Sequence, residues 1–152
     1  MFKEMRRQDK LLSKEKTLSL LRLGEVGTLS TIGENGYPYM VVVNYVFYND
    51  KIYIHSAKEG YKLENIQNKE SVCFSVYDNV KIIGEDLNTI YESLIVFGKA
   101  KVIDGDYQVL LALIKKYSNI DDLIAMSLIE KEIHLTSLIE IEIEYISGKQ
   151  GK

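Results

Sequence analysis

The stretch Ile52-Tyr-Ile-His-Ser-Ala-Lys-Glu-Gly-Tyr-Lys-Leu-Glu-Asn-Ile66 combines a strand pattern with the start of a helix. Residues alternate between two faces in its first half, so Tyr53 and His55 share one face of a predicted strand. Gly60 then lets the chain turn, and the apolar spacing that follows predicts a short helix. The exposed N–H groups at the start of that helix, together with Lys62, form a candidate site for an anion, most naturally a phosphate. An ordinary strand-to-helix turn with a solvated lysine is the alternative interpretation.

Composition limits the classes of protein to be considered. The chain has 152 residues, 46% of them hydrophobic and 27% charged, which is typical of one globular domain spanning 1–152. A formal charge of −3 gives no basic surplus for binding nucleic acid. No stretch approaches the roughly 20 apolar residues of a membrane span, so we expect no membrane partner and a cytoplasmic location. The single cysteine, Cys73, stands between Val72 and Phe74, a setting typical of a half-buried thiol rather than a nucleophile.

The pattern along the chain predicts a mainly β protein with peripheral helices. A helix is expected between the N-cap candidate Ser13 and Gly24, a second at 60–67, and a helical pair between 107 and 133 that breaks at 118–122. Residues 78–89 are interpreted as a loop, Gly98 as a bulge, and the tail from Ser147 as flexible or docked on a partner. Six antiparallel strands are expected, at residues 26–32, 37–48, 51–56, 72–77, 92–103 and 139–145.

Six mostly sequential strands, with helices inserted between them, favour a small closed or nearly closed barrel. Side chains fill the interior of a barrel of this size, so a ligand would bind at its outer surface or at a contact between subunits. That arrangement favours a dimer. In the last strand, glutamates alternate with isoleucines, and we interpret the glutamate row as a solvated face rather than a metal site.

The order of short motifs resembles the FMN-binding split-barrel family of pyridoxamine 5′-phosphate oxidase-like proteins, most closely its 5-nitroimidazole-resistance (Nim) type. The resemblance extends over nearly the whole chain and implies a six-stranded antiparallel split β-barrel. The motifs that carry it are Met5-Arg-Arg-Gln-Asp9, Gly36-Tyr-Pro-Tyr39 leading to Val43-Asn44-Tyr45, Ile52-Tyr-Ile-His-Ser-Ala57 with Gly60-Tyr-Lys-Leu63, Val72-Cys-Phe74, Tyr91-Glu-Ser93 with Phe97-Gly-Lys99, and Ile146-Ser-Gly-Lys149.

The resemblance implies a homodimer with FMN at the interface. One strand would follow the flavin ring through its backbone, a second segment would hold the ribityl chain and phosphate, and a third would reach the flavin of the other subunit. Val42, where many relatives have proline, and Tyr61, where the oxidases have an arginine for the phosphate, depart from the family pattern. The cofactor-binding residues implied are Met40, Val41, Val42, Val43 and Asn44, then His55, Ser56, Ala57, Gly60 and Lys62, and across the interface Tyr91 and Ser93.

Three functions fit these expectations. The first is an FMN-dependent oxidoreductase that passes electrons from a reduced nicotinamide to a small acceptor such as a nitroaromatic, with His55 as its candidate catalytic residue. A structural role for His55 is an equal alternative, and Asn44 could be either a flavin contact or a core amide. The second function is a non-enzymatic FMN carrier or redox sensor. The third is a haem-binding split barrel, which two histidines in the whole chain make less favourable.

Overall fold

The computed structural model describes residues 1–151 of the chain, and Lys152 lies outside the described residues. Its centre is a single antiparallel sheet of seven strands, where the sequence predicted six. The strands lie in the order β2-β1-β5-β6-β7-β4-β3 across the sheet. Their bounds are β1 Gly27–Ile32, β2 Pro38–Val43, β3 Val46–Tyr48, β4 Lys51–Ala57, β5 Ser71–Ile83, β6 Asn88–Asp104 and β7 Thr136–Gly151.

The additional strand arises because the predicted strand at 37–48 is two strands. The chain leaves β2 at Val43 and enters β3 at Val46, and only Asn44 and Tyr45 lie between them. Both halves are β-branched and aromatic, so composition alone gave no sign of the break. β2 pairs with β1 and β3 pairs with β4, at opposite edges of the sheet.

A two-residue connection between the edge strands requires the sheet to curl. Three peptide steps separate the Cα atoms of Val43 and Val46, and they can span roughly 11 Å at most. The two edges must therefore come together, which rolls the sheet into a barrel. No β2–β3 ladder forms where the edges meet. We call the two-residue connection Asn44–Tyr45 the seam. The fold is a split barrel, as the sequence predicted.

Within residues 1–151, four α-helices surround the barrel, all of them close to their predicted positions. Ser13 caps the first by accepting a hydrogen bond from the Lys16 N–H at 3.2 Å, and Gly24 ends it. Asp106 and Asp121 cap the helical pair in the same way. Among residues 1–151, no helix is both long and apolar enough to cross a membrane. The bounds are α1 Lys14–Leu23, α2 Tyr61–Asn68, α3 Tyr107–Tyr117 and α4 Asp122–Glu132, with short 3₁₀ turns at Gln8–Lys10, Gly84–Asp86 and Ile133–Leu135.

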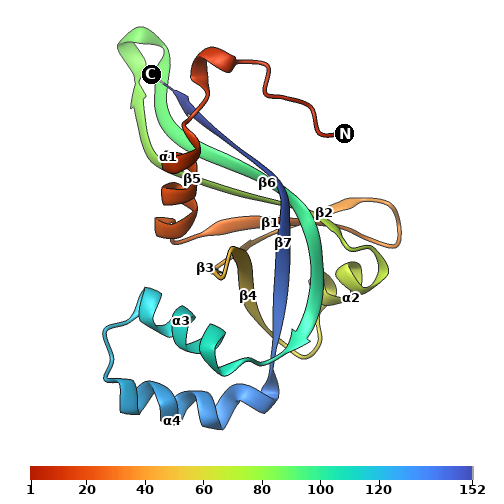
Figure 1. Ribbon diagram of the computed structural model, residues 1–152. Helices are drawn as coiled ribbons and strands as arrows, with labels where there is room; N and C mark the ends of the chain where they lie inside the picture. Colours follow the sequence, from red (N-terminus) through yellow and green to blue (C-terminus); the bar gives the residue numbers. More distant parts are fainter. Residues whose placement is uncertain (152) are drawn as a thin grey trace.

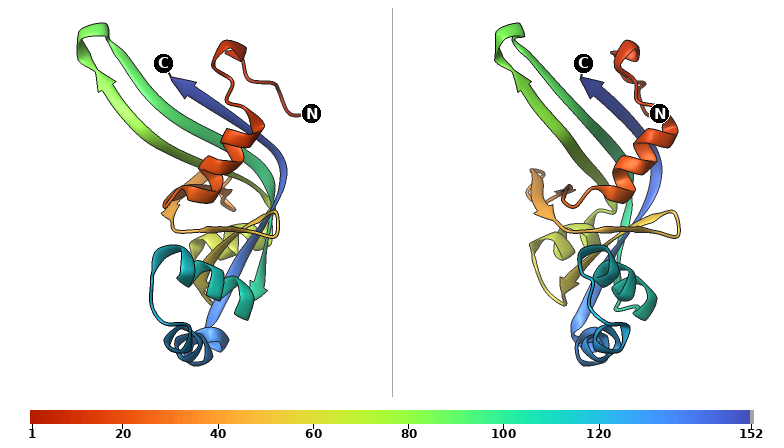
Figure 2. Two further views of the ribbon diagram at one scale, coloured as in Figure 1. Left: turned by 60° about the vertical axis from the view of Figure 1, so that its left-hand side comes forward. Right: turned by 90° about the vertical axis from the view of Figure 1, so that its left-hand side faces the viewer.

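The structure corrects the predictions for two irregular segments. Residues 78–89 are not a loop, because β5 and β6 continue as a ribbon to the turn at Gly84–Asp86, with one irregularity between Asp78 and Lys81. Of the two alternatives for the tail, flexible or docked on a partner, the first is wrong up to Gly151, because β7 continues there beside β6 and pairs Gly151 with Tyr91. Figures 1 and 2 show this long ribbon at the end of the molecule opposite to α3 and α4.

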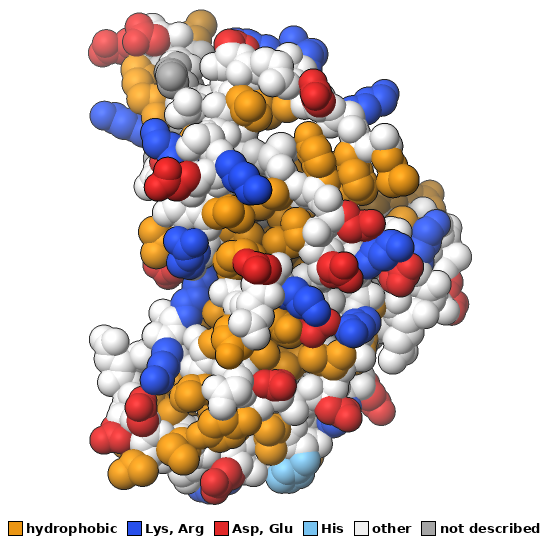
Figure 3. All heavy atoms as spheres, viewed as in Figure 1, with side chains coloured by type: hydrophobic (Ala, Val, Ile, Leu, Met, Phe, Trp, Pro, Cys, Tyr) orange, Lys and Arg blue, Asp and Glu red, His pale blue; other side chains and the backbone are white. Residues whose placement is uncertain are grey.

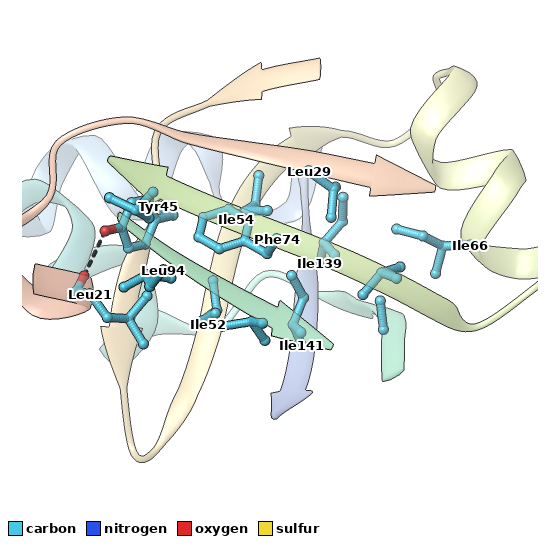
Figure 4. Packing of buried hydrophobic residues seen from close by; sticks show 14 of the residues in the cluster. Leu21, Leu29, Tyr45, Ile52, Ile54, Ile66, Phe74, Leu94, Ile139 and Ile141 are labelled. Atoms are coloured by element: carbon cyan, nitrogen blue, oxygen red, sulfur yellow. Dashed lines mark hydrogen bonds between the residues drawn. The ribbon is translucent and has the colours of Figure 1, made fainter. Parts of the chain in front are cut away.

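The barrel interior is the main hydrophobic core. Ile52 and Ile54 of β4 enter it, as the alternation predicted, and Phe74 of β5 is fully buried there. The Tyr45 ring meets the Phe74 ring edge to face, with centroids 4.9 Å apart. Its buried hydroxyl donates to the Leu21 carbonyl at 2.6 Å, so the seam is attached to α1 (Figure 4). A second cluster joins α3 and α4 to the outer face of β3, β4 and β7.

The bulge predicted at Gly98 is present. The register between β6 and β7 shifts between Phe97 and Gly98. A Cβ at Gly98 would collide with the backbone carbonyl of Glu142, so glycine allows the two strands to approach.

Candidate functional site

The predicted anion site lies where β4 turns into α2. Gly60 is the N-cap residue with φ of 154°, a conformation that side chains disfavour, and no side chain caps the helix. The N–H groups of the first turn are therefore free to bind a ligand. Lys62 is half-buried in that turn, and no carboxylate within residues 1–151 pairs with it. Donors and positive charge at this point are what an oxyanion requires.

Contacts with the β1–β2 hairpin fix α2 in place. The ring of Tyr61 stacks on that of Tyr39 in β2, with centroids 4.5 Å apart. Buried Asn65 donates from Nδ2 to the Thr31 hydroxyl at 3.0 Å. Tyr61, which departs from the family arginine, thus holds the helix against the strand that begins at Pro38. The N-terminus of α2 is therefore beside β2, although some twenty residues separate them in sequence.

β2 itself has an open edge. It pairs with β1 on one side only, so part of its backbone hydrogen-bonding capacity is unused in the sheet. Met40 and Val42 are largely exposed at 67% and 68%, and Val41 and Val43 are half-buried against the core. An exposed apolar strand with free backbone groups has the properties that the resemblance implies for contact with a planar cofactor.

His55 and Asn44 line one cleft. It has a volume of about 560 Å³ and lies between the helical pair and the outer face of the barrel. The side chain of His55 is exposed, and no hydrogen bond engages it among residues 1–151. The lining consists of Asn44, His55, Leu110, Leu113, Ile114, Tyr117, Ser118, Ile120, Leu128, Ile129, Glu132 and Thr136.

Asn44 is not a core amide, because it is exposed. Its Nδ2 donates to the Glu25 carbonyl at 3.1 Å, which leaves the side-chain oxygen facing no donor among the described residues. One of the two alternatives left by the sequence is thereby removed. The hydrogen bond to the Glu25 carbonyl fixes the Asn44 side chain beside the cleft.

Lys116 and Tyr117, at the end of α3, contact the seam from outside the barrel, and we call these two residues the clamp. The Tyr117 hydroxyl accepts from the Tyr45 N–H at 3.1 Å and lies within donating distance of the Tyr45 and Glu25 carbonyls, at 2.9 and 2.7 Å. Lys116 donates from Nζ to the Tyr45 carbonyl at 2.8 Å and lies 3.7 Å from the centre of the Tyr45 ring. Burial lowers the pKa of Lys116 to about 8.

Sequence reasoning did not identify this clamp. Helical spacing marked Tyr117 as one apolar position of α3, and nothing in the pattern reveals a phenol that contacts residues about 70 positions away. A tyrosine in the last turn of an amphipathic helix, where leucine would serve for packing, is the one available signal.

The remaining predicted residues fall into two groups. Ser56 is buried and Ala57 exposed at the end of β4, five to six residues before Lys62 and on the path to the anion site. Tyr91 and Ser93 are half-buried in β6, where they pair with Gly151 and Lys149. They lie toward the ribbon end of the sheet, and the structure does not bring them to the others within one chain.

The surroundings of Cys73 and of the glutamate row in β7 bear on two further predictions. Burial raises the pKa of the half-buried Cys73 thiol, which fits an unreactive cysteine. The glutamate row is only partly solvated, because Glu140 is nearly enclosed. Its carboxylate accepts from the Tyr53 hydroxyl at 2.9 Å and pairs with Lys51 and Lys101 at 3.3 and 3.4 Å. These hydrogen bonds and charges outweigh burial and lower the pKa of Glu140.

The fold and the open strand edge define a split-barrel protein with a candidate ligand site on its outer surface. The family model of pyridoxamine 5′-phosphate oxidase matches residues 13–150. The chain therefore belongs to the pyridoxamine 5′-phosphate oxidase family, as its motifs indicated. A comparison with curated proteins found no match.

Solved structures share the fold at low sequence identity. A conserved hypothetical protein from Mycobacterium tuberculosis matches with a TM-score of 0.83 and 15% identity over 97% of this chain and 90% of its own. A candidate 5-nitroimidazole antibiotic resistance protein from Bacteroides thetaiotaomicron matches with a TM-score of 0.74 and 20% identity, over 93% of this chain and 86% of its own. An FAD-binding protein from Mesorhizobium loti matches with a TM-score of 0.66 and 18% identity, over 94% of this chain and 98% of its own.

Proposed function

We propose that this protein is an FMN-dependent oxidoreductase that passes electrons from a reduced nicotinamide to a small acceptor such as a nitroaromatic. Family membership and structural neighbours described as an FAD-binding protein and a candidate nitroimidazole-resistance protein support a flavin-related oxidoreductase. FMN would supply the two-electron chemistry when bound, and the protein would bind and orient it.

One observation carries the proposal. Segments assigned to the flavin from motifs far apart in sequence lie together, because the Tyr39–Tyr61 stack holds the anion site against β2. The open strand edge thereby lies beside the uncapped turn of α2 with Lys62, and Asn44, which directly follows β2, lines the same cleft as His55. A planar ring system with a single phosphate tail matches this sequence of apolar edge and anion site.

The residues divide the work by chemistry. Lys62 and the free N–H groups after Gly60 would hold the phosphate, with Ser56 and Ala57 beside the ribityl chain. Met40 to Asn44 would support the ring through the backbone of β2. His55 would donate a hydrogen bond or a proton to the reacting group, because reduction of a nitro group consumes protons and an imidazole nitrogen can carry one.

FMN is preferred over FAD because α2 offers one anion site with a half-buried lysine. Lys62 is the single basic residue of α2, and Tyr61 stands where the oxidases have an arginine. Within α2, a second phosphate would find no further basic side chain.

A homodimer with flavin at the interface is part of the proposal. Tyr91 lies ten residues along β6 from Lys101, which lines a hollow with the end of α2. At about 3.3 Å per residue, that separation is roughly 30 Å. That distance from the end of α2 supports the proposal that Tyr91 and Ser93 contribute to the flavin site of a second copy rather than to that of their own chain.

The alternatives predict different spectra and kinetics. A carrier or sensor would show flavin absorbance without steady-state turnover, and a haem protein would show a Soret band. The test is to purify the protein, record its absorbance before and after adding FMN, and measure reduced-nicotinamide oxidation with nitroaromatics and quinones as acceptors. Flavin absorbance with acceptor-dependent turnover supports the proposal. Absence of turnover with both nicotinamides across this panel would reject the enzyme and favour the carrier.

A further inference from the structure

The cleft beneath the helical pair is built differently from the open edge of β2. Six aliphatic side chains from α3, α4 and the turn between them form most of its wall, including Leu113, Ile120 and Leu128. Its volume of about 560 Å³ is within the roughly 300 to 1,000 Å³ typical of small-molecule pockets. Figure 3 shows hydrophobic side chains gathered over this helical end of the molecule. Such a wall favours a ligand that is itself mainly apolar.

A few polar atoms converge on one side of the cleft. The imidazole of His55 has no partner among residues 1–151, and the oxygen of the Asn44 amide accepts nothing there. His55 is on the barrel wall and Asn44 at the seam, opposite the aliphatic side chains of the helices. A ligand lying against the helices can therefore exchange hydrogen bonds with the barrel side.

Charge restricts the ligand further. Glu132, at the end of α4, is the one carboxylate in the lining, whose other titratable side chains are His55 and Tyr117. Among residues 1–151, the lining contains no lysine or arginine that could compensate this charge. An anion would be repelled by the Glu132 carboxylate and would gain nothing from the apolar wall. A cation would lose its hydration against six aliphatic side chains, and its attraction to the exposed Glu132 would repay little of that cost.

We propose that this cleft binds the electron acceptor and selects neutral, flat, mainly apolar molecules that carry a hydrogen-bonding group. The role as acceptor site rests on the proposed function, whereas the binding preference rests on the cleft alone. His55, shared between the cleft and the predicted flavin region, places the reacting group of the ligand next to the cofactor site. Glu132 acts as a specificity-determining residue against anions.

Three isosteric probes test the preference without any turnover. The neutral 2-naphthamide, the anionic 2-naphthoate and the cationic 2-naphthylmethylammonium are titrated calorimetrically into the wild-type protein, with and without FMN. The neutral amide should bind most tightly. Glu132→Gln should improve 2-naphthoate binding about two- to fivefold, the scale of one exposed charge, and leave the amide unchanged. Equal binding of the three probes would overturn the selectivity.

Matched tryptophan variants test the location. Leu128→Trp fills the cleft and should weaken 2-naphthamide about tenfold or more, since the added ring occupies the space for the probe. Leu123→Trp, on the same helix but 74% exposed and outside the lining, should change it less than about twofold. Ile120→Trp in the turn between the helices is a second filling variant if Leu128→Trp lowers the melting temperature.

The outcomes separate this inference from the proposed function. Tight 2-naphthamide binding that the filling variants abolish supports the cleft even if no flavin turnover is found. Binding that the filling variants leave intact, or that Leu123→Trp weakens equally, assigns the probe to another surface and overturns the inference even in an active enzyme.

Discussion

Replacing Tyr117 by phenylalanine should loosen the seam in a measurable way. The substitution removes one oxygen that contacts the Tyr45 N–H and the carbonyls of Tyr45 and Glu25. The carbonyls keep other donors, because Lys116 remains on Tyr45 and Asn44 remains on Glu25. The Tyr45 N–H alone loses its partner.

The magnitude follows from that single orphaned donor. A buried N–H left without a partner costs about 1 to 3 kcal/mol. Tyr117 is 39% exposed, so water can reach part of the site and the lower half of that range applies. We expect a loss of about 1.5 kcal/mol in the free energy of unfolding, because packing of the ring itself is unchanged. For a chain of this size that corresponds to a decrease in melting temperature of about 3 to 6 °C.

Urea denaturation followed by circular dichroism measures this change. The matched control is Tyr37→Phe, because Tyr37 is 73% exposed and its hydroxyl makes no hydrogen bond among residues 1–151. The control should stay within about 0.5 kcal/mol of wild type. Hydrogen exchange should also show faster exchange of the Tyr45 amide in Tyr117→Phe. If the two variants unfold at the same urea concentration, the clamp does not support the seam and the reasoning is refuted.

Three further outcomes are expected. Lys62→Ala should weaken FMN about 10- to 100-fold while affecting riboflavin little, because only FMN offers a phosphate, and equal losses in fluorescence titrations would contradict the anion site. His55→Ala should retain FMN yet slow steady-state turnover about 100-fold, whereas loss of flavin at undiminished activity per bound flavin would make His55 a binding residue. The lowered pKa of Glu140 means that its contribution to stability is present above its ordinary pKa and is lost as pH falls through the lowered value. Acid titrations of unfolding should therefore show a shallower loss in Glu140→Gln than in wild type, and identical profiles would count against the network.

Sequence patterns predicted correctly those structural elements that depend on residues close together in the chain. Ser13 caps α1 through its own side chain, and Asn49 and Asp50 form a tight turn with positive φ values of 49° and 60°. The alternation in β7 correctly placed Ile139 and Ile141 in the core. Each of these depends on residues within a few positions of one another, which a sequence pattern records.

The sequence-based predictions failed, or gave no signal, where contacts between residues far apart in the chain determine the structure. The ribbon beyond Asp78 is exposed, with Ile82 at 75% and Leu87 at 96%, so no buried face imposes alternation on its sequence. The break at the seam depends on which edges of the sheet meet, and the clamp of Tyr117 depends on α3 docking against it. Lys62 was predicted as part of an anion site from the local strand-to-helix pattern, whereas the candidate role of His55 came with the family resemblance. The proximity of the start of α2 to β2 became visible only through the Tyr39–Tyr61 stack.

The seam also has a consequence for the order in which the chain folds. Strand pairing with neighbours cannot close this barrel, because β2 and β3 share no ladder and their junction is held by α1 from before it and α3 from well after it. A growing chain can therefore form the β1–β2 and β3–β4 hairpins early, yet it cannot join them in a closed cylinder before β7, which links β4 to β6, has been synthesised. Closure should be a late event, so Tyr117→Phe should mainly accelerate unfolding and leave the folding rate nearly unchanged in stopped-flow measurements.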